Sequence, residues 1–207
     1  MSQPVQTSRF LTPQILRAFC SFGGSSKARQ CDRSAAAASA PVVSFDGEAL
    51  AVRPLQPEDA TDFQAFVRRL SRQSRRARFW STFDELPASL LSALTETKAS
   101  QVALVAEVGS PRGIVGEARY VGDENGAAAE LAVVVADEWQ RRGVARQLME
   151  VLQSTARADG YGRLYCYIQA ENDAMRALAR SCGYRPAGAV GEAGARRFEC
   201  LLHSRTI

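Results

Sequence analysis

The 207-residue sequence predicts an α/β fold, and two strand–helix units in its second half carry that prediction. Leu131–Ala136 is an unbroken apolar run rich in valine, which is the composition of a strand covered on both faces. From Val144 onward, apolar side chains recur at helical spacing. Leu164–Ala170 and the helical segment Asn172–Gly183 repeat this order, so we expect the two strands to run parallel.

The first half predicts further strands and two helical segments. Pro57–Asp59 is typical of a helix N-terminus, and an apolar stripe continues from there to Leu70. Asn125-Gly126 is a typical hairpin pair between strands. The remaining expected elements are strands over Leu50–Leu55, Val102–Ala106, Ile114–Val121 and Arg196–Leu202, and a helix over Leu86–Thr95. The whole order is β-α-α-β-β-β-α-β-α-β-β, which makes a mixed sheet.

Residues 1–41 differ in composition from the rest of the chain. They contain an Ala/Ser run over Ser34–Ala40 and have no acidic residue before Asp32. We expect a disordered or low-complexity tail, and an organellar transit peptide is the alternative. A single domain is expected over residues 50–207, with its first residues near Val42.

Cysteine, histidine and charge content limit the classes of function. The five cysteines have no paired spacing, which indicates reduced thiols and a cytoplasmic protein. A single histidine and the absence of a Cys/His cluster argue against a metal site. No apolar run is long enough to span a membrane, so we expect no membrane partner.

Arg68–Arg78 contains six arginines and is followed by the aromatic residues Phe79, Trp80 and Phe83. Basic and aromatic residues together are compatible with nucleic-acid binding. A solvated helix face followed by core aromatics is the favoured interpretation, because the net charge of the chain is only +4. We therefore expect no nucleic-acid partner.

The turn between the valine-rich strand and the next helix is a physical anion site. The first backbone N–H groups of a helix lack partners, and the helix dipole favours negative charge there. Gly143 allows close approach of an anion, and Arg141, Arg142 and Arg146 add positive charge. As a sequence pattern, Gln140-x-x-Gly143-x-Ala145 resembles the acyl-CoA pyrophosphate loop of the GNAT superfamily of N-acetyltransferases.

A second segment supports the resemblance. Asn172, Leu178 and the pair Gly183-Tyr184 are spaced as in the downstream helix of GNAT proteins. The expected order of elements also matches the GNAT arrangement from Leu50 to about Leu202, a single domain with a mostly antiparallel sheet and helices on both faces. Leu70–Phe79 is similar to a segment of bacterial protein-lysine acetyltransferases.

The resemblance implies an acetyl-CoA-dependent N-acetyltransferase with acetyl-CoA as co-substrate and no metal. The acceptor is a primary amine, with a protein lysine favoured and small-molecule amines as the alternative. A non-catalytic acyl-CoA-binding module is a further alternative. The implied cofactor-binding residues are Val133, Val134, Val135, Gln140, Arg141, Arg142, Gly143, Val144, Ala145, Arg146 and Asn172.

An amine with a pKa near 10.4 is charged at neutral pH, and its deprotonation costs on the order of 4–5 kcal/mol, so a general base is expected. Glu130 occupies the place of the base in the resembling lysine acetyltransferases, and Glu117 is the second candidate. Backbone N–H groups of Val133–Val135 are candidates for stabilising the oxyanion. Ala179 stands where many GNAT enzymes have the tyrosine that protonates the leaving thiolate, which leaves water or Tyr184 for that role.

Overall fold

The computed structural model describes residues 43–45, 48–81, 83–96, 100–109, 113–123, 125–190 and 194–202. Its strands are β1 (Val43–Phe45), β2 (Glu48–Pro54), β3 (Gln101–Val108), β4 (Gly113–Gly122), β5 (Ala128–Val135), β6 (Arg163–Gln169), β7 (Arg185–Val190) and β8 (Ala195–Leu201). Within these residues they form one sheet in the order β1-β2-β3-β4-β5-β6-β8-β7. All neighbouring strands are antiparallel except β5 and β6, which are parallel. The expected mixed, mostly antiparallel sheet is confirmed.

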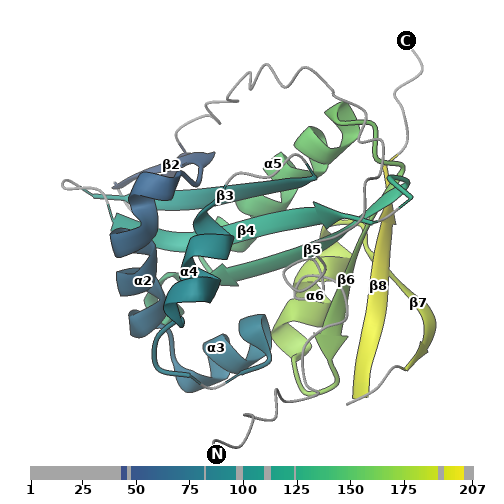
Figure 1. Ribbon diagram of the computed structural model, residues 1–207. Helices are drawn as coiled ribbons and strands as arrows, with labels where there is room; N and C mark the ends of the chain where they lie inside the picture. The colour runs from purple at the N-terminus through teal and green to yellow at the C-terminus, as the bar shows by residue number, and fades with distance from the viewer. Residues whose placement is uncertain are drawn as a thin grey trace, which may run out of the picture.

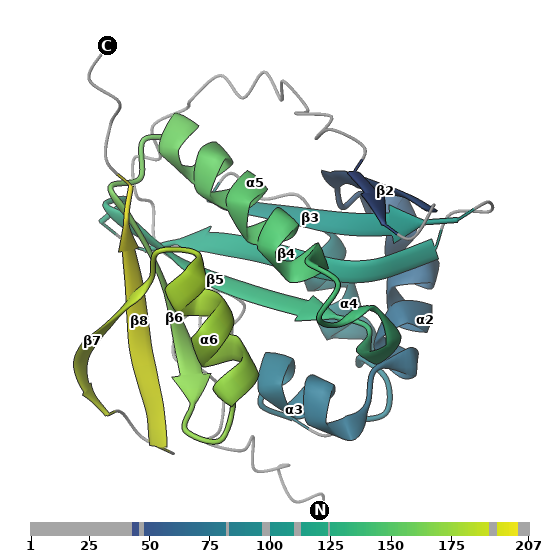
Figure 2. The ribbon, with the colours of Figure 1, turned by 180° about the vertical axis from the view of Figure 1, so that it is seen from behind.

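Helices cover both faces of this sheet, as expected. One face carries α2 (Ala60–Arg69), α3 (Arg72–Phe79) and α4 (Ala88–Thr95), which follow the 3-10 turn η1 (Pro57–Asp59) (Figure 1). The other face carries α5 (Val144–Ala158) and α6 (Asp173–Ser181) (Figure 2). A second 3-10 turn, η2 (Asp137–Trp139), joins β5 to the loop before α5.

Alternating side chains of β5 divide between two hydrophobic clusters. Leu131 and Val135 pack with Leu148 of α5, in the cluster on the α5 and α6 face. Val134 belongs to the cluster that contains Phe63 of α2. Because side chains alternate between the faces of a strand, every second residue of β5 faces the α2–α4 side. That side includes Glu130, four residues before Val134.

The basic segment keeps the expected solvated face at Arg68, Arg69, Arg72 and Arg76, which are exposed, but two of its arginines turn inward. Leu70 ends α2 in an extended conformation, and the Ser71 hydroxyl caps α3 by accepting a hydrogen bond from the Ser74 N–H at 3.1 Å. The new helix turns Arg75 and Arg78 inward, where they are 9% and 7% exposed. The chain thereby places two arginines in the interior, and each has a carboxylate partner.

The predicted tail over residues 1–41 lies outside the described residues, so the structure does not test this prediction. In the part of the chain that is described, no helix has both the length and the apolar composition needed to cross a membrane.

Candidate active site

The parallel strands β5 and β6 separate soon after they pair. Their register covers only Ala128–Glu130 against Arg163–Tyr165. Beyond Glu130, β5 continues beside β4 alone, while β6 continues beside β8 alone. The two strands diverge in both ribbon views (Figures 1 and 2). We call this opening, between residues 131–135 of β5 and 166–169 of β6, the fork.

Along the fork, the backbone groups of β5 that point away from β4 have no strand partner in the described part of the chain. The N–H of Ala136 donates to the Val115 carbonyl at 2.8 Å, which fixes which residues of β5 face β4. Because this orientation alternates along an antiparallel strand, Val134 faces β4, whereas Val133 and Val135 face the fork. The carbonyl of Val135 accepts a hydrogen bond from the Gln140 side chain at 3.1 Å. Of the backbone N–H groups of Val133–Val135 that are candidates for stabilising the oxyanion, those of Val133 and Val135 therefore face the fork.

The fork opens into a cavity of about 1230 Å³ that α3, the loop after η2 and the start of α6 complete. Most of the residues predicted for the site line it: Glu130, Val133, Val134, Val135, Gln140, Arg141, Gly143, Ala145, Arg146 and Asn172. Two of the predicted cofactor-binding side chains do not. Val144 is 1% exposed and packs in the core against the sheet. Arg142 places its guanidinium 5.0 Å from the ring centroid of Trp139.

The loop before α5 has the geometry of an anion site. Gly143 caps the 15-residue helix with a left-handed φ of 87°, and Arg141 is also left-handed at 59°. The unpaired N–H groups and the positive dipole end of α5 therefore stand at the cavity. Arg146 lies one turn into the helix and lines the cavity too. Asn172 caps α6 by accepting a hydrogen bond from the Met175 N–H at 3.0 Å.

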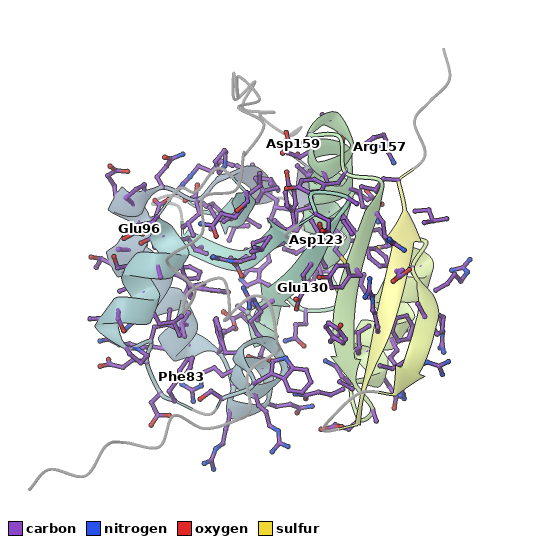
Figure 3. The ribbon with its side chains drawn as sticks, turned by 45° about the vertical axis from the view of Figure 1, so that its right-hand side comes forward. Phe83, Glu96, Asp123, Glu130, Arg157 and Asp159 are labelled. Carbon is purple, nitrogen blue, oxygen red and sulfur yellow. The ribbon has the colours of Figure 1, made fainter. Side chains whose placement is uncertain are left out.

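Glu130 is the carboxylate at the apex of the fork, near the centre of the molecule (Figure 3). Its side chain is buried, yet it lines the cavity. Among the described residues its Oε2 atom has no hydrogen-bond partner. Burial raises the pKa of Glu130 to about 7, although the charges of Arg78 and Arg197 oppose this shift. A carboxyl group with this pKa can both accept and release a proton at neutral pH.

Glu117 has a different environment, although it lies on the neighbouring strand. It is completely buried, and its carboxylate accepts hydrogen bonds from Arg78 at 3.1 Å and from Arg119 at 2.5 Å. Burial alone raises the pKa of Glu117, but the charges of Arg119 and Arg78 outweigh this effect and hold the pKa below its usual range. A carboxylate held as an anion by two guanidinium groups is a poor proton acceptor, so the geometry does not support the second candidate base.

Comparison with known proteins agrees with the geometry of the fork and the anion loop. Residues 64–184 match the acetyltransferase (GNAT) family. The chain belongs to this family. It is 36% identical to an acetyltransferase of Pseudomonas aeruginosa over 143 residues, which cover 67% of this chain and 76% of that protein. The chain is accordingly an acyl-CoA-dependent N-acetyltransferase of the GNAT type.

Solved structures of GNAT proteins share the fold. The GNAT domain of S. lividans PAT has a TM-score of 0.71 and 28% identity, and the match covers 76% of this chain and 93% of that domain. The acetyltransferase yncA of Salmonella typhimurium, solved with acetyl-CoA, has a TM-score of 0.62 and 16% identity, and the match covers 76% and 96% of the two chains. At this lower identity the similarity shows the fold alone.

A polar network in this GNAT domain joins α3 to the anion loop. The carboxylate of Asp137 accepts from the Ser71 N–H at 2.8 Å and from the hydroxyls of Ser71 and Ser74 at 2.7 and 2.9 Å. Gln140 donates to the Ser74 hydroxyl at 3.2 Å. Burial raises the pKa of Asp137, but the hydrogen bonds from Ser71 and Ser74 outweigh burial and hold it low. This network has no signal in the sequence, because 66 residues separate Ser71 from Asp137.

The site lacks the tyrosine that many GNAT enzymes use, and its predicted substitute is elsewhere. Ala179 is fully buried in the core. Tyr184 is also fully buried in that cluster and does not line the cavity, so the geometry does not support it, of the two options water and Tyr184, as the donor to the thiolate. Tyr167 of β6 does line the cavity. Its signal in the sequence is alternation, because it stands between the apolar Cys166 and Ile168 of a half-polar strand.

Proposed function

We propose that the protein transfers an acetyl group from acetyl-CoA to a primary amine, with a lysine side chain of a protein as the favoured acceptor. The observation that carries this proposal is the fork, which brings to one cavity the glycine-capped helix N-terminus and Glu130, whose Oε2 atom has no hydrogen-bond partner among the described residues. The similarity to the GNAT domain of S. lividans PAT, and the Leu70–Phe79 segment, favour a protein acceptor over a small amine.

The cofactor's pyrophosphate is assigned to the loop before α5. Its oxygens would accept from the first N–H groups of the helix, and Arg141 and Arg146 would supply positive charge. The pantetheine arm would lie in the fork and pair with the backbone of Val133 and with the Val135 N–H, as an added strand does. One of these N–H groups would then donate to the thioester oxygen, where negative charge develops during attack.

Glu130 is assigned as the general base. The amine nitrogen attacks the thioester carbonyl carbon, and the Glu130 carboxylate removes a proton from nitrogen, directly or through a water. The tetrahedral intermediate collapses by breaking the carbon–sulfur bond, which yields the amide and the CoA thiolate. Tyr167 is the candidate donor of the proton that the thiolate takes up. Small-molecule amines remain the alternative acceptors, whereas membership of an acetyltransferase family removes the basis for a non-catalytic module.

Calorimetric titration of acetyl-CoA, CoA and dephospho-CoA into the wild type and the Gly143→Glu variant tests the cofactor site. The wild type is expected to bind all three, and Gly143→Glu is expected to lose binding because a carboxylate then occupies the anion site. Gly126→Glu is the matched control, since Gly126 is also left-handed but lies in the β4–β5 turn with open space around it. A wild type that binds none of the three would overturn the proposal. Release of free thiol from acetyl-CoA over a panel of lysine peptides and small amines then identifies the acceptor.

A further inference from the structure

Trp80 has a backbone conformation that a bulky residue rarely adopts. It is the C-cap of α3, with φ 55° and ψ 21° in the left-handed region. Helices commonly end in this conformation, but with glycine, because a Cβ atom strains the left-handed backbone. A strained residue persists where the surrounding structure demands it, and such residues gather at functional sites.

Core packing does not explain why tryptophan occupies this position. Its neighbour Phe79 is 5% exposed and belongs to the cluster on the α2–α4 face. Trp80 is half-buried and, among the described residues, belongs to neither hydrophobic cluster. It lines the cavity instead. The strained residue Trp80 therefore lies at the cavity and not in the hydrophobic core.

The contacts of α3 place Trp80 away from the anion loop. The first turn of the helix is bonded to Asp137 and Gln140, next to that loop. The helix then extends about 12 Å before it reaches Trp80. Near that end, Arg78 is bonded to Glu117 of β4, and the side chain of Gln169 of β6 donates to the Arg76 carbonyl at 3.5 Å. The end of α3 thus lies across the fork, on the face of the sheet that Glu130 shares.

Glu130 is the group in this part of the cavity that can attract a cation, against the charges of Arg78 and Arg197, which act on the same carboxylate. The guanidinium of Arg78 is paired with Glu117, whereas the Oε2 atom of Glu130 has no hydrogen-bond partner among the described residues. An indole face attracts an ammonium group, and its apolar surface suits an unbranched aliphatic chain.

We propose that Trp80 is a specificity-determining residue, whose indole forms the wall on which a primary ammonium group with an unbranched aliphatic stem rests beside Glu130. This inference rests on the proposed acetyl transfer and assigns the acceptor class as lysine-like amines. Other amines, such as anilines or branched amines, gain less from the same wall.

Three substitutions separate the role of the ring from the role of the backbone. Trp80→Phe keeps a ring, Trp80→Ala removes it and keeps the strain, and Trp80→Gly removes both. Turnover is measured by thiol release with a lysine peptide, and stability by thermal unfolding. We expect Trp80→Ala and Trp80→Gly to lower kcat/KM for the peptide about tenfold or more, mainly through the KM of the peptide, while Trp80→Phe loses less. The affinity for CoA is expected to stay unchanged in all three, and Trp80→Gly to melt at a higher temperature than Trp80→Ala.

If the wild type acetylates the lysine peptide and Trp80→Gly has the same kcat/KM as the wild type, the inference is overturned and the proposed function stands. A wild type that acetylates no amine would overturn the proposed function, and a binding measurement then decides the inference. The chain has two tryptophans, so Trp80→Phe isolates the fluorescence of Trp139. With CoA bound, lysine amide is expected to change the wild-type fluorescence saturably and to leave Trp80→Phe unaffected. The absence of a saturable change in the wild type would overturn the inference.

Discussion

Glu130 and Tyr165 form the last pair in the parallel register of β5 and β6, and the two strands separate directly after them. The carboxylate thus stands where the backbone hydrogen bonds between these strands stop. On one side of it β5 and β6 are paired, and on the other side the cavity begins. This position accounts for a side chain that is buried and still open to a substrate.

Glu130→Gln is expected to lower kcat about a hundredfold or more, because an amide cannot take the proton from the amine. In the wild type, kcat/KM should rise with pH through an apparent pKa of about 7, as the carboxyl becomes the active base. Thiol release measured from pH 6 to pH 9 checks both points. Glu138→Gln, an exposed carboxylate in η2, is the control. Equal turnover of Glu130→Gln and wild type across this range would refute the assignment of the base.

The same substitution should stabilise the protein at high pH. The folded-state pKa of Glu130 is about 7 against a reference of 4.5, so the folded protein binds this proton more tightly than the unfolded chain. The wild type therefore loses stability as pH rises from about 4.5 to 7, by roughly 3 kcal/mol in total. In urea unfolding, the free energy of unfolding of Glu130→Gln should exceed that of the wild type by a small amount at pH 5 and by a large amount at pH 8. A gain independent of pH would mean that ionisation is not its cause.

Glu117→Gln is expected to destabilise the fold by about 3–5 kcal/mol, because it leaves Arg78 and Arg119 in the interior without their carboxylate. The pKa of Glu117 is lowered on folding, so its contribution is present above the unfolded pKa and is lost as pH falls through the folded value. Urea unfolding at neutral pH measures the loss. Glu85→Gln, which breaks a mostly exposed pair with Arg68, should cost less than about 1 kcal/mol. If Glu117→Gln and Glu85→Gln lower the free energy of unfolding by similar amounts, burial does not determine how much an ion pair contributes here.

Arg141→Gly should separate cofactor binding from backbone strain. Arg141 is left-handed and lines the cavity, so glycine removes both a positive charge and a Cβ atom that disfavours this conformation. Arg141→Ala removes the charge alone. Both variants are expected to bind CoA several-fold more weakly, whereas the glycine variant should be more stable than the alanine variant by about 1 kcal/mol. Calorimetry and thermal unfolding measure the two effects, and undiminished affinity in both variants would exclude a role for Arg141 in binding.

Tyr167→Phe is expected to lower kcat by about tenfold, at or below the lower end of the range for acid catalysis, because a thiolate leaves readily even without a proton donor. Tyr184→Phe is the matched control, since Tyr184 is buried in the core and away from the cavity. Thiol release under saturating substrates compares them. If the two variants retain the same kcat as wild type, the proton comes from solvent.

The continuous parts of the site could be predicted from sequence, and the parts assembled across the sheet could not. The turn from Gln140 to Ala145 is local, so a strand, a glycine and an amphipathic helix were enough to locate it. Within that turn the side-chain positions of Arg142 and Val144 could not be predicted, because they depend on packing against Trp139 and the core. The position of the fork depends on where β5 and β6 stop pairing. The spacing of apolar residues in the sequence does not indicate that point.

Two arginines of the basic segment leave the solvated face that the sequence predicts, and a long-range ion pair explains this for Arg78. Arg78 pairs with Glu117, which lies 39 residues further along the chain. This ion pair buries an arginine that the sequence pattern predicts to be solvated. The left-handed conformation of Trp80 was equally hidden, because glycine is the residue that normally signals it.

The hydrogen bonds between Asp137 and the two serines of α3 have a consequence for how tightly the two substrates bind. They connect the segment assigned to the cofactor phosphates with the helix that ends at Trp80. A ligand that orders either segment lowers the entropic cost of ordering the other. Thermodynamic linkage then requires equal and reciprocal effects on the two affinities. Acetyl-CoA should therefore tighten the binding of the amine by the same factor by which the amine tightens the binding of acetyl-CoA.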